Sequence, residues 1–289
     1  MTTKPIVVGT DGSAESIRAV EWAAREAELH DTTLRIVSAA ELLPRMYSPP
    51  YATDPDTVAD ALRRNHDWAL GAAAHAADAM EPGLLIDTDL LHGPPAVTVT
   101  DAGAGALMLV IGSRGIGAFS AMVLGSVGRY AAIHAACPVV VVREETMAAH
   151  RRIIVGIRDP QDCATALAFG FEEAQLRNAS LLAVHAWQSP RTAGPHMPPL
   201  PDRRPADAQP GTELEELLND WHHKYPEVAA SYDVVHGHPG RVLADLSARA
   251  DLVVLGRHAR HGRALPGPAR VAHAVLNHAH GPVVTVPAD

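Results

Sequence analysis

Short apolar segments rich in β-branched residues alternate along this chain with longer, alanine-rich stretches. A short run that is apolar throughout is typical of a strand buried on both faces, whereas the longer stretches have the 3.6-residue period of a helix. Over the first half, the pattern predicts strands at 5–10, 33–39, 84–91, 106–111 and 138–142. It predicts helices at 13–30, 57–80, 95–105 and 126–136. This alternation indicates a parallel sheet with helices on both faces.

The same pattern occurs twice. The block 6–11 returns at 153–158, and the turn at His92 returns at His236. The second copy predicts strands at 152–157, 179–186, 230–236, 251–255 and 282–286. A repeat of this length indicates two domains, which we place at 1–145 and 150–289. The predicted fold class is α/β, with two tandem doubly wound domains, each a five-stranded parallel sheet with helices on both faces, as in Rossmann-like folds.

Composition narrows the class of protein. The 289 residues, 47% of them apolar, suffice for two cores of ordinary size. The net charge of −9 gives no electrostatic footprint for nucleic acid, and no apolar run reaches the ~18 residues of a membrane span. The first residues lack a secretory pattern, and Cys137 and Cys163 lack metal spacing. We therefore expect a cytoplasmic protein with no membrane span, no nucleic-acid partner and no metal site.

The turn after the first strand carries the first candidate ligand group. In an open parallel sheet, ligands bind beyond the carboxyl ends of the strands, where the strand order reverses. Thr10, Asp11 and Gly12 follow the first strand directly. The carboxylate of Asp11 is suited to accept hydrogen bonds from a ribose or a base, but Asp11 or Ser13 is equally suited to cap the next helix. Both roles stay open.

A glycine-rich loop after the fourth strand is the second candidate. Its glycines allow the backbone to approach a phosphate, and the helix that begins near Ser126 offers unpaired N–H groups. The loop lacks the lysine of a Walker A motif, and no GxGxxG occurs in the chain. Arg114 and Arg129 can face phosphate oxygens, although an exposed side chain is the simpler interpretation for each. A glycine-rich connector without a ligand is the alternative for the loop as a whole.

Specific spacing in this loop resembles a known family. Gly112-x2-Gly115-x9-Gly125-Ser126 matches the G-2x-G-9x-G-S/T ATP signature of the universal stress proteins at every specified position. Asp11, the turn after His92 and the closing strand from Cys137 are similar to that family as well. The resemblance covers nearly the whole chain twice, as in tandem-domain actinobacterial members.

The resemblance implies an adenine nucleotide alpha hydrolase-like fold that binds ATP, with magnesium as an accompanying ion. Asp11 and the backbone near Ala39 would hold the adenosine, and the loop glycines, Ser126 and Val127 would hold the phosphates. The expected ligand set is Thr10, Asp11, Gly12, Ala39, Gly112, Arg114, Gly115, Gly117, Gly125, Ser126 and Val127. The closing strands 138–142 and 282–286 would form a dimer interface, in a homodimer or in an intramolecular pseudo-dimer.

The second half departs from the motif. Alignment by the repeat keeps only Gly256, the counterpart of Gly112. The other motif positions carry different residues in the second half: Arg158 in place of Asp11, Ala259 in place of Gly115, Ala269 in place of Gly125 and Arg270 in place of Ser126. We expect weak or absent ATP binding there, because Cβ atoms obstruct a close backbone approach. The many histidines of this half fall on separate predicted elements, which favours solvated side chains over a metal site.

These observations favour an ATP-binding regulatory protein of the stress response, with ATP in the first domain acting as a sensor or switch. No His, Asp or Glu lies in 112–126 to activate a water, so we expect at most slow ATP hydrolysis and no catalytic residue. Two alternatives remain. One is a slow ATPase, and the other is a nucleotide-independent dimerisation or interaction module built on the apolar closing strands.

Overall fold

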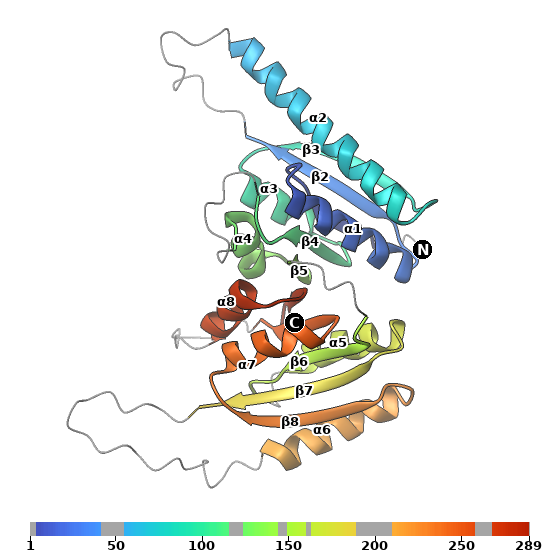
Figure 1. The fold of residues 1–289 in the computed structure, drawn as a ribbon, viewed down its shortest axis with the longest axis vertical. Coiled ribbons are helices and arrows are strands. Elements are labelled where there is room, and N and C mark those ends of the chain that lie inside the picture. Colours follow the sequence, from blue (N-terminus) through green and yellow to red (C-terminus); the bar gives the residue numbers. More distant parts are fainter. Residues whose placement is uncertain are drawn as a thin grey trace, which may run out of the picture. The chain divides into compact units, whose positions relative to one another are not determined.

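The chain forms two compact units, shown in the computed structural model of Figure 1. The first unit comprises Met1–Glu145 and Gly281–Pro287, and the second comprises Thr146–His280 and Ala288–Asp289. The structure describes residues 4–41, 55–115, 124–143, 149–159, 163–188, 210–257 and 268–288. Within these ranges, no helix has both the length and the apolar character that crossing a membrane requires.

The first unit is built on a mostly parallel sheet. Its strands are β1 (Ile6–Gly9), β2 (Leu34–Ala40), β3 (Ile86–His92), β4 (Met108–Gly112), β5 (Val139–Val142) and β10 (Val283–Val286). They lie in the order β3-β2-β1-β4-β5-β10, and only β10 is antiparallel to its neighbour β5. The order reverses between β1 and β4, where Gly9 pairs with Ile111. The carboxyl ends of these two strands therefore flank the switch point of the sheet.

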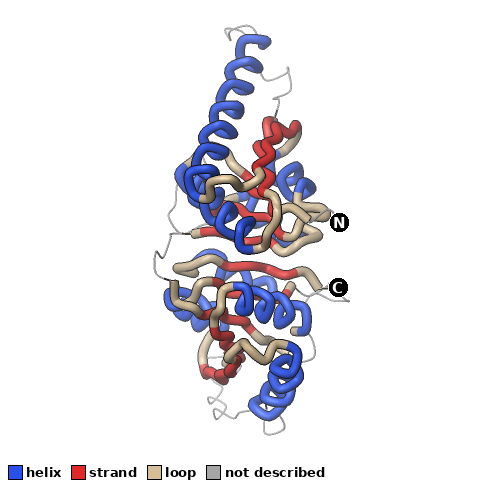
Figure 2. Tube along the Cα trace, turned by 90° about the vertical axis from the view of Figure 1, so that its right-hand side faces the viewer, coloured by secondary structure: helices blue, strands red, loops and turns tan. Residues whose placement is uncertain are grey.

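Helices cover both faces of this sheet (Figure 2). They are α1 (Ala14–Leu29), α2 (Pro55–Met80), α3 (Pro95–Ala102) and α4 (Ser126–His134). α1 packs against α2, and α3 packs against α4. Val37 lies in a core cluster with Val99 of α3, whereas its neighbour Ser38 contacts His66 of α2. Because successive residues of a strand point to opposite faces, α2 and α3 cover opposite sides of β2.

The second unit repeats the arrangement. Its strands β6 (Arg152–Gly156), β7 (Ser180–Trp187), β8 (Ala230–His236) and β9 (Leu252–Gly256) are parallel, in the order β9-β6-β7-β8. Its helices are α5 (Ala164–Leu176), α6 (Pro210–Lys224), α7 (Pro239–Leu246), a 3₁₀ turn at Ser247–Arg249, and α8 (Pro268–His278). The switch point of this sheet lies between β6 and β9.

The predicted α/β class, with doubly wound parallel sheets, is confirmed, and most element bounds differ from the predictions by one to three residues. Two differences have physical causes. The third helix ends at Ala102 rather than 105, because Gly103 follows it and Gly105 has a φ of +79°. The last strand of the second repeat, β10, lies in the first unit and pairs antiparallel with β5, since an apolar strand finds its partner by tertiary packing, which periodicity does not encode.

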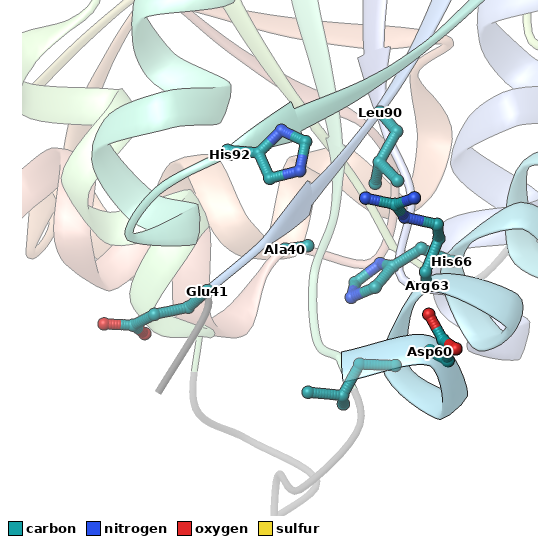
Figure 3. A pocket seen from close by; sticks show the side chains of 8 residues that line it. Ala40, Glu41, Asp60, Arg63, His66, Leu90 and His92 are labelled. Atoms are coloured by element: carbon teal, nitrogen blue, oxygen red, sulfur yellow. The ribbon is translucent and has the colours of Figure 1, made fainter. Parts of the chain in front are cut away.

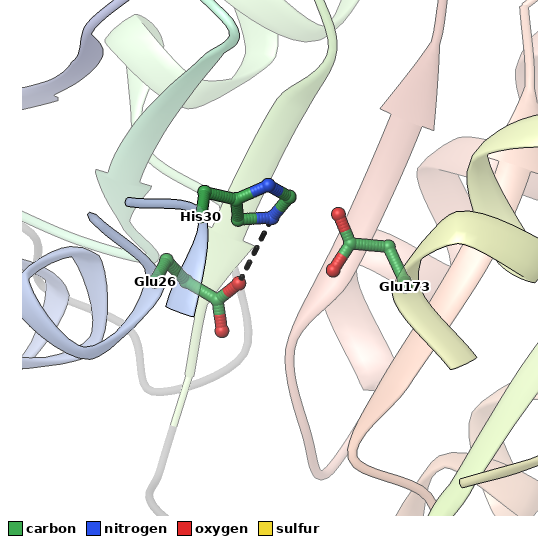
Figure 4. A group of neighbouring side chains, drawn as sticks. All are labelled: Glu26, His30 and Glu173. Atoms are coloured by element: carbon green, nitrogen blue, oxygen red, sulfur yellow. Dashed lines mark ion pairs between the residues drawn. The ribbon is translucent and has the colours of Figure 1, made fainter. Parts of the chain in front are cut away.

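Buried carboxylates in α1 and α5 each have a cationic or titratable partner on the same helix. In α1, Glu26 Oε2 lies 3.8 Å from Nε2 of His30, one turn later (Figure 4). In α5, Glu173 pairs with Arg177, again one turn later. A partner at i+4 lies on the same face of the helix, so each carboxylate is compensated locally.

An aromatic cluster joins α5 to α6 in the second unit. The fully buried ring of Phe171 stacks on Trp221 at 5.5 Å between centroids and on Tyr225 at 5.4 Å. A buried phenylalanine that contacts two further rings contributes more than its area alone.

Phe171→Ala should therefore lower the free energy of unfolding of the second unit by about 3–5 kcal/mol, because it leaves a cavity between three elements. Urea titration followed by tryptophan fluorescence measures this change. Leu176→Ala, on the same helix but 37% exposed, is the matched control and should cost far less. Equal losses in the two variants would contradict the assignment of Phe171 to the core.

Candidate functional site

Asp11 lies at the end of β1 in a hydrogen-bonded turn. Its Oδ1 accepts hydrogen bonds from the backbone N–H of Ser13 at 3.0 Å and from the Ser13 hydroxyl at 2.6 Å. The Ser13 hydroxyl also accepts from the N–H of Ser16 at 3.2 Å and so caps α1. Gly12, with a φ of +80°, supplies the left-handed residue that the turn needs. Ser13 is therefore the helix cap, and Asp11 orients the cap.

Thr10 supports this turn through hydrogen bonds of its side chain. Its side chain is buried, with 6% exposed, and its Oγ1 accepts from the N–H of Gly12 at 3.2 Å. Thr10 Oγ1 also lies 3.0 Å from Ser16 Oγ, and because Ser16 donates its only proton to the carbonyl of Ser13, Thr10 must be the donor in that contact. The hydroxyl of Thr10 is thus used within the turn, so Thr10 supports the site indirectly.

Two side chains that the sequence analysis did not identify complete the support. Ser38, buried in β2, donates to the carbonyl oxygen of Thr10 at 2.9 Å, and Nδ1 of His66 lies 2.9 Å from the same hydroxyl. A hydroxyl has one proton, so His66 must donate through an Nδ1–H. A serine within the apolar stretch 36–40 of β2 was a signal available in the sequence. His66 had none, because its contact depends on how α2 packs.

The glycines of the β4 loop meet the first turn at close range. A Cβ added to Gly112 would lie 2.7 Å from the carbonyl oxygen of Glu15, in the first turn of α1. A Cβ added to Gly115 would lie 2.3 Å from Oδ2 of Asp11. Real Cβ contacts are not that short, so a Cβ on Gly112 would collide with backbone, whereas a Cβ on Gly115 would push the end of the Asp11 side chain aside. The structure therefore brings Asp11 and Gly115, far apart in sequence, into direct contact.

The first turn of α4 is open to an anion. Gly125 is the N-cap residue and no side chain caps the helix. The first intrahelical bond joins the N–H of Arg129 to the carbonyl of Gly125 at 3.0 Å, so the preceding N–H groups, those of Ser126 and Val127 included, precede the helical ladder. Ser126 is exposed, and Val127 is half-buried against the core. Such a terminus attracts negative charge.

Arg114 brings a fixed positive charge to the same place. Its side chain is 23% exposed, and Nη2 lies 3.3 Å from Oε1 of Glu15, which Arg18 also approaches at 3.5 Å. The buried Nε of Arg114 has no hydrogen-bond partner in the part of the chain that the structure describes. The interpretation of Arg114 as a fully exposed side chain is therefore wrong, because its ion pair with Glu15 holds it against α1. Arg129 is exposed.

The remaining predicted ligands divide into two groups. Ala39 is buried, and its side chain packs in the core cluster with Val37 and Val99, so only its backbone could serve a ligand. Gly125 has room for a side chain, since the nearest atoms to an added Cβ lie 3.8 Å away. Gly117 lies outside the described residues.

The second unit keeps the scaffold but not the site. At the position of Thr10 it has the buried Ile157, whose carbonyl oxygen lies 3.1 Å from Nδ1 of His185, the counterpart of Ser38. Arg158 and Asp159 are both exposed at the position of the turn. A Cβ on Gly256 would meet its nearest neighbour at an ordinary 3.5 Å. Ala259 and the side chains of Ala269 and Arg270 lie outside what the structure describes.

Fold and site together define a tandem pair of doubly wound α/β units, of which the first presents a carboxylate and a glycine-rich loop at its switch point. The model of the Universal stress protein family matches residues 2–143 and 149–287. The chain therefore belongs to the universal stress protein family.

Several individual proteins are similar to this chain. Universal stress protein MT2052 of Mycobacterium tuberculosis is 34% identical over 316 residues, which cover 100% of this chain and 97% of that protein. A universal stress protein from Archaeoglobus fulgidus has a similar fold, with a TM-score of 0.76 over 99% of both chains at 15% identity. A solved universal stress protein in complex with cAMP matches 49% of this chain at 26% identity, with a TM-score of 0.38.

Gly112→Ala should destabilise the first unit by about 1–3 kcal/mol, because its Cβ would collide with backbone atoms of α1 that cannot move aside. Gly256→Ala is the matched control at the equivalent position and should have little effect, because its nearest contact is ordinary. Thermal unfolding of both variants tests the difference. A neutral Gly112→Ala would contradict the close packing of α1 on β4.

Proposed function

We propose that the first unit binds ATP and that ATP occupancy makes this protein a sensor or switch in the stress response. The observation that carries the proposal is the contact of the Asp11 carboxylate with Gly115, beside the uncapped N-terminus of α4. A carboxylate at one end and unpaired N–H groups at the other match the two ends of a nucleotide. Family membership supports the same ligand.

In this proposal, Asp11 and the backbone near Ala39 hold the adenosine. Oδ1 of Asp11 is occupied by Ser13, so Oδ2, which lies against Gly115, is the oxygen that faces the loop. The phosphates lie on the N–H groups of Ser126 and Val127. The buried Nε of Arg114 finds in a phosphate oxygen the acceptor that it lacks among the described residues.

The proposal assigns binding rather than rapid turnover. The carboxylates nearest the loop, Asp11 and Glu15, already have partners, Ser13 for the first and Arg114 and Arg18 for the second. Neither is therefore placed as a general base, and a magnesium ion would be held mainly by the phosphates themselves. The alternative of a slow ATPase predicts that bound ATP converts to ADP on standing.

The pairing of the closing strands β5 and β10 limits how two chains can form a dimer. β5, the strand expected to form the interface of a homodimer or of an intramolecular pseudo-dimer, is paired with β10 of the same chain. A homodimer through the edge of β5 is thus not part of the proposal. Dimerisation elsewhere and the cytoplasmic location remain predictions, which light scattering and cell fractionation test.

Nucleotide released from the denatured protein should amount to about one ATP per chain, because among the described residues the contact of a carboxylate with a glycine occurs in the first unit alone. Chromatography identifies and counts the nucleotide. Two per chain would show that Arg158 and its neighbours do not prevent binding in the second unit. No release, followed by no binding on titration, would overturn the proposed function.

Asp11→Ala and Gly115→Ala should each weaken ATP binding at least about tenfold, which corresponds to roughly 1.4 kcal/mol. The first removes the carboxylate, and the second pushes it aside with a Cβ. Titration calorimetry with ATP, and with ADP, GTP and cAMP as competitors, measures the loss.

Asp101→Ala and Gly71→Ala are the matched controls. Asp101 is exposed on α3, and a Cβ on Gly71 has no neighbour within 4 Å. Full ATP affinity in both site variants, or equal losses in the controls, would place the ligand elsewhere.

A further inference from the structure

A small pocket opens at the carboxyl ends of β2 and β3, on the side covered by α2 (Figure 3). Its volume is about 50 Å³. Its lining consists of Ala40, Glu41, Asp60, Leu62, Arg63, His66, Leu90 and His92. Pockets for drug-sized ligands measure roughly 300–1,000 Å³, whereas a water molecule in the liquid occupies about 30 Å³. The pocket therefore suits a group of a few atoms and is too small for a nucleotide.

The second unit carries a larger side chain at the same register position. In the first unit Ala40 pairs with His92, and in the second Trp187 pairs with His236 at the same register. The rings of Trp187 and His236 lie 4.6 Å apart between centroids. The repeat thus places an indole beside the histidine where the first unit has the methyl group of Ala40.

His66 presents a defined atom to this pocket. Its Nδ1–H is held by Ser38, whose own proton goes to the carbonyl of Thr10, so Nε2 is the nitrogen left for a ligand. The neutral ring offers a lone pair at Nε2, and the protonated ring offers an N–H. Protonation leaves the bond to Ser38 intact, because Nδ1 is a donor in both forms.

The charge of the lining depends on pH. The fixed groups are the guanidinium of Arg63 and the carboxylates of Glu41 and Asp60, a net charge of −1. With both imidazoles protonated the lining carries +1. Arg63 has no ion pair among the described residues, and Figure 3 shows the carboxylate of Glu41 directed away from the other labelled side chains. The positive groups thus face the pocket more directly than Glu41 does.

We propose that this pocket is a binding site for a small oxyanion, held by Arg63, His66 and His92 and occupied when the two imidazoles are protonated. Oxygen atoms of the anion accept from the guanidinium and from Nε2–H of His66. The lining of this pocket shares no residue with the ligand set expected for ATP.

Sulfate is the probe that tests the proposal, since its charge does not change between pH 5.5 and 7.5. Histidine changes its charge within this range of pH. At constant ionic strength, the imidazole resonances of His66 and His92 should shift saturably with sulfate at pH 5.5. The affinity should fall about tenfold or more at pH 7.5, because imidazoles that donate to the anion lose protons as the pH rises.

Variants separate this site from general surface charge. Arg63→Gln should weaken sulfate binding about tenfold or more, and Ala40→Trp should abolish it by filling the pocket. Arg64→Gln, the exposed neighbour on α2 that does not line the pocket, should leave the titration unchanged. No saturable shift at pH 5.5, equal affinity at the two pH values, or equal losses for Arg63→Gln and Arg64→Gln would each overturn the proposal.

The experiments distinguish failure of the proposed oxyanion site from failure of the proposed ATP-binding function. Gly115→Ala should weaken ATP and leave the sulfate response of His66 and His92 intact, whereas Arg63→Gln should do the reverse. A circular dichroism melt of each variant shows whether the fold is retained. If Ala40→Trp is unfolded, Arg63→Gln and its Arg64 control still decide the outcome.

Discussion

The close approach of the turn after β1 to the loop after β4 is the constraint on which the rest of the site depends. Gly112 allows the first turn of α1 to lie on the end of β4, and Gly115 allows the carboxylate of Asp11 to lie on the loop. Both contacts occur at the switch point of the first unit, where the neighbouring strands β1 and β4 send their helices to different faces of the sheet. Because these glycines have no side chain, backbone atoms of α1 and the carboxylate of Asp11 can occupy the positions that a Cβ would otherwise fill.

Comparison of the two units separates scaffold from function. In both, a side chain on the second strand of the unit contacts the carbonyl that follows the first strand, through Ser38 in one and His185 in the other. This contact therefore belongs to the scaffold. The glycine contact with a carboxylate and the open pocket belong to the first unit as described, while the second unit has Trp187 beside His236 at the register position of Ala40. One fold thus carries different side chains at equivalent positions of its two copies.

Sequence alone predicted the fold class, because buried parallel strands and amphipathic helices have distinct periods and the repeat doubled the signal. It also predicted that Asp11 and the glycine-rich loop would meet, because the switch point follows from the order of strands. It did not predict His66, Arg114's partner Glu15, or the pocket at Ala40. Those depend on the rotation of α1 and α2 about their axes, which the hydrophobic pattern constrains only loosely. The pairing of β10 with β5 was expected from the family resemblance rather than from the hydrophobic pattern, since an all-apolar strand of four residues fits any open edge.

The position of β10 has a consequence for folding. The first unit contains a strand that the ribosome delivers only after the whole second unit has been made. Until then, β5 has an unpaired edge of four valines, the kind of surface that invites aggregation. Pairing β5 with β10 also requires closure of a very long loop, which slows folding relative to local contacts. Synthesis of this chain therefore includes an interval in which the apolar edge of β5 lacks the strand that covers it.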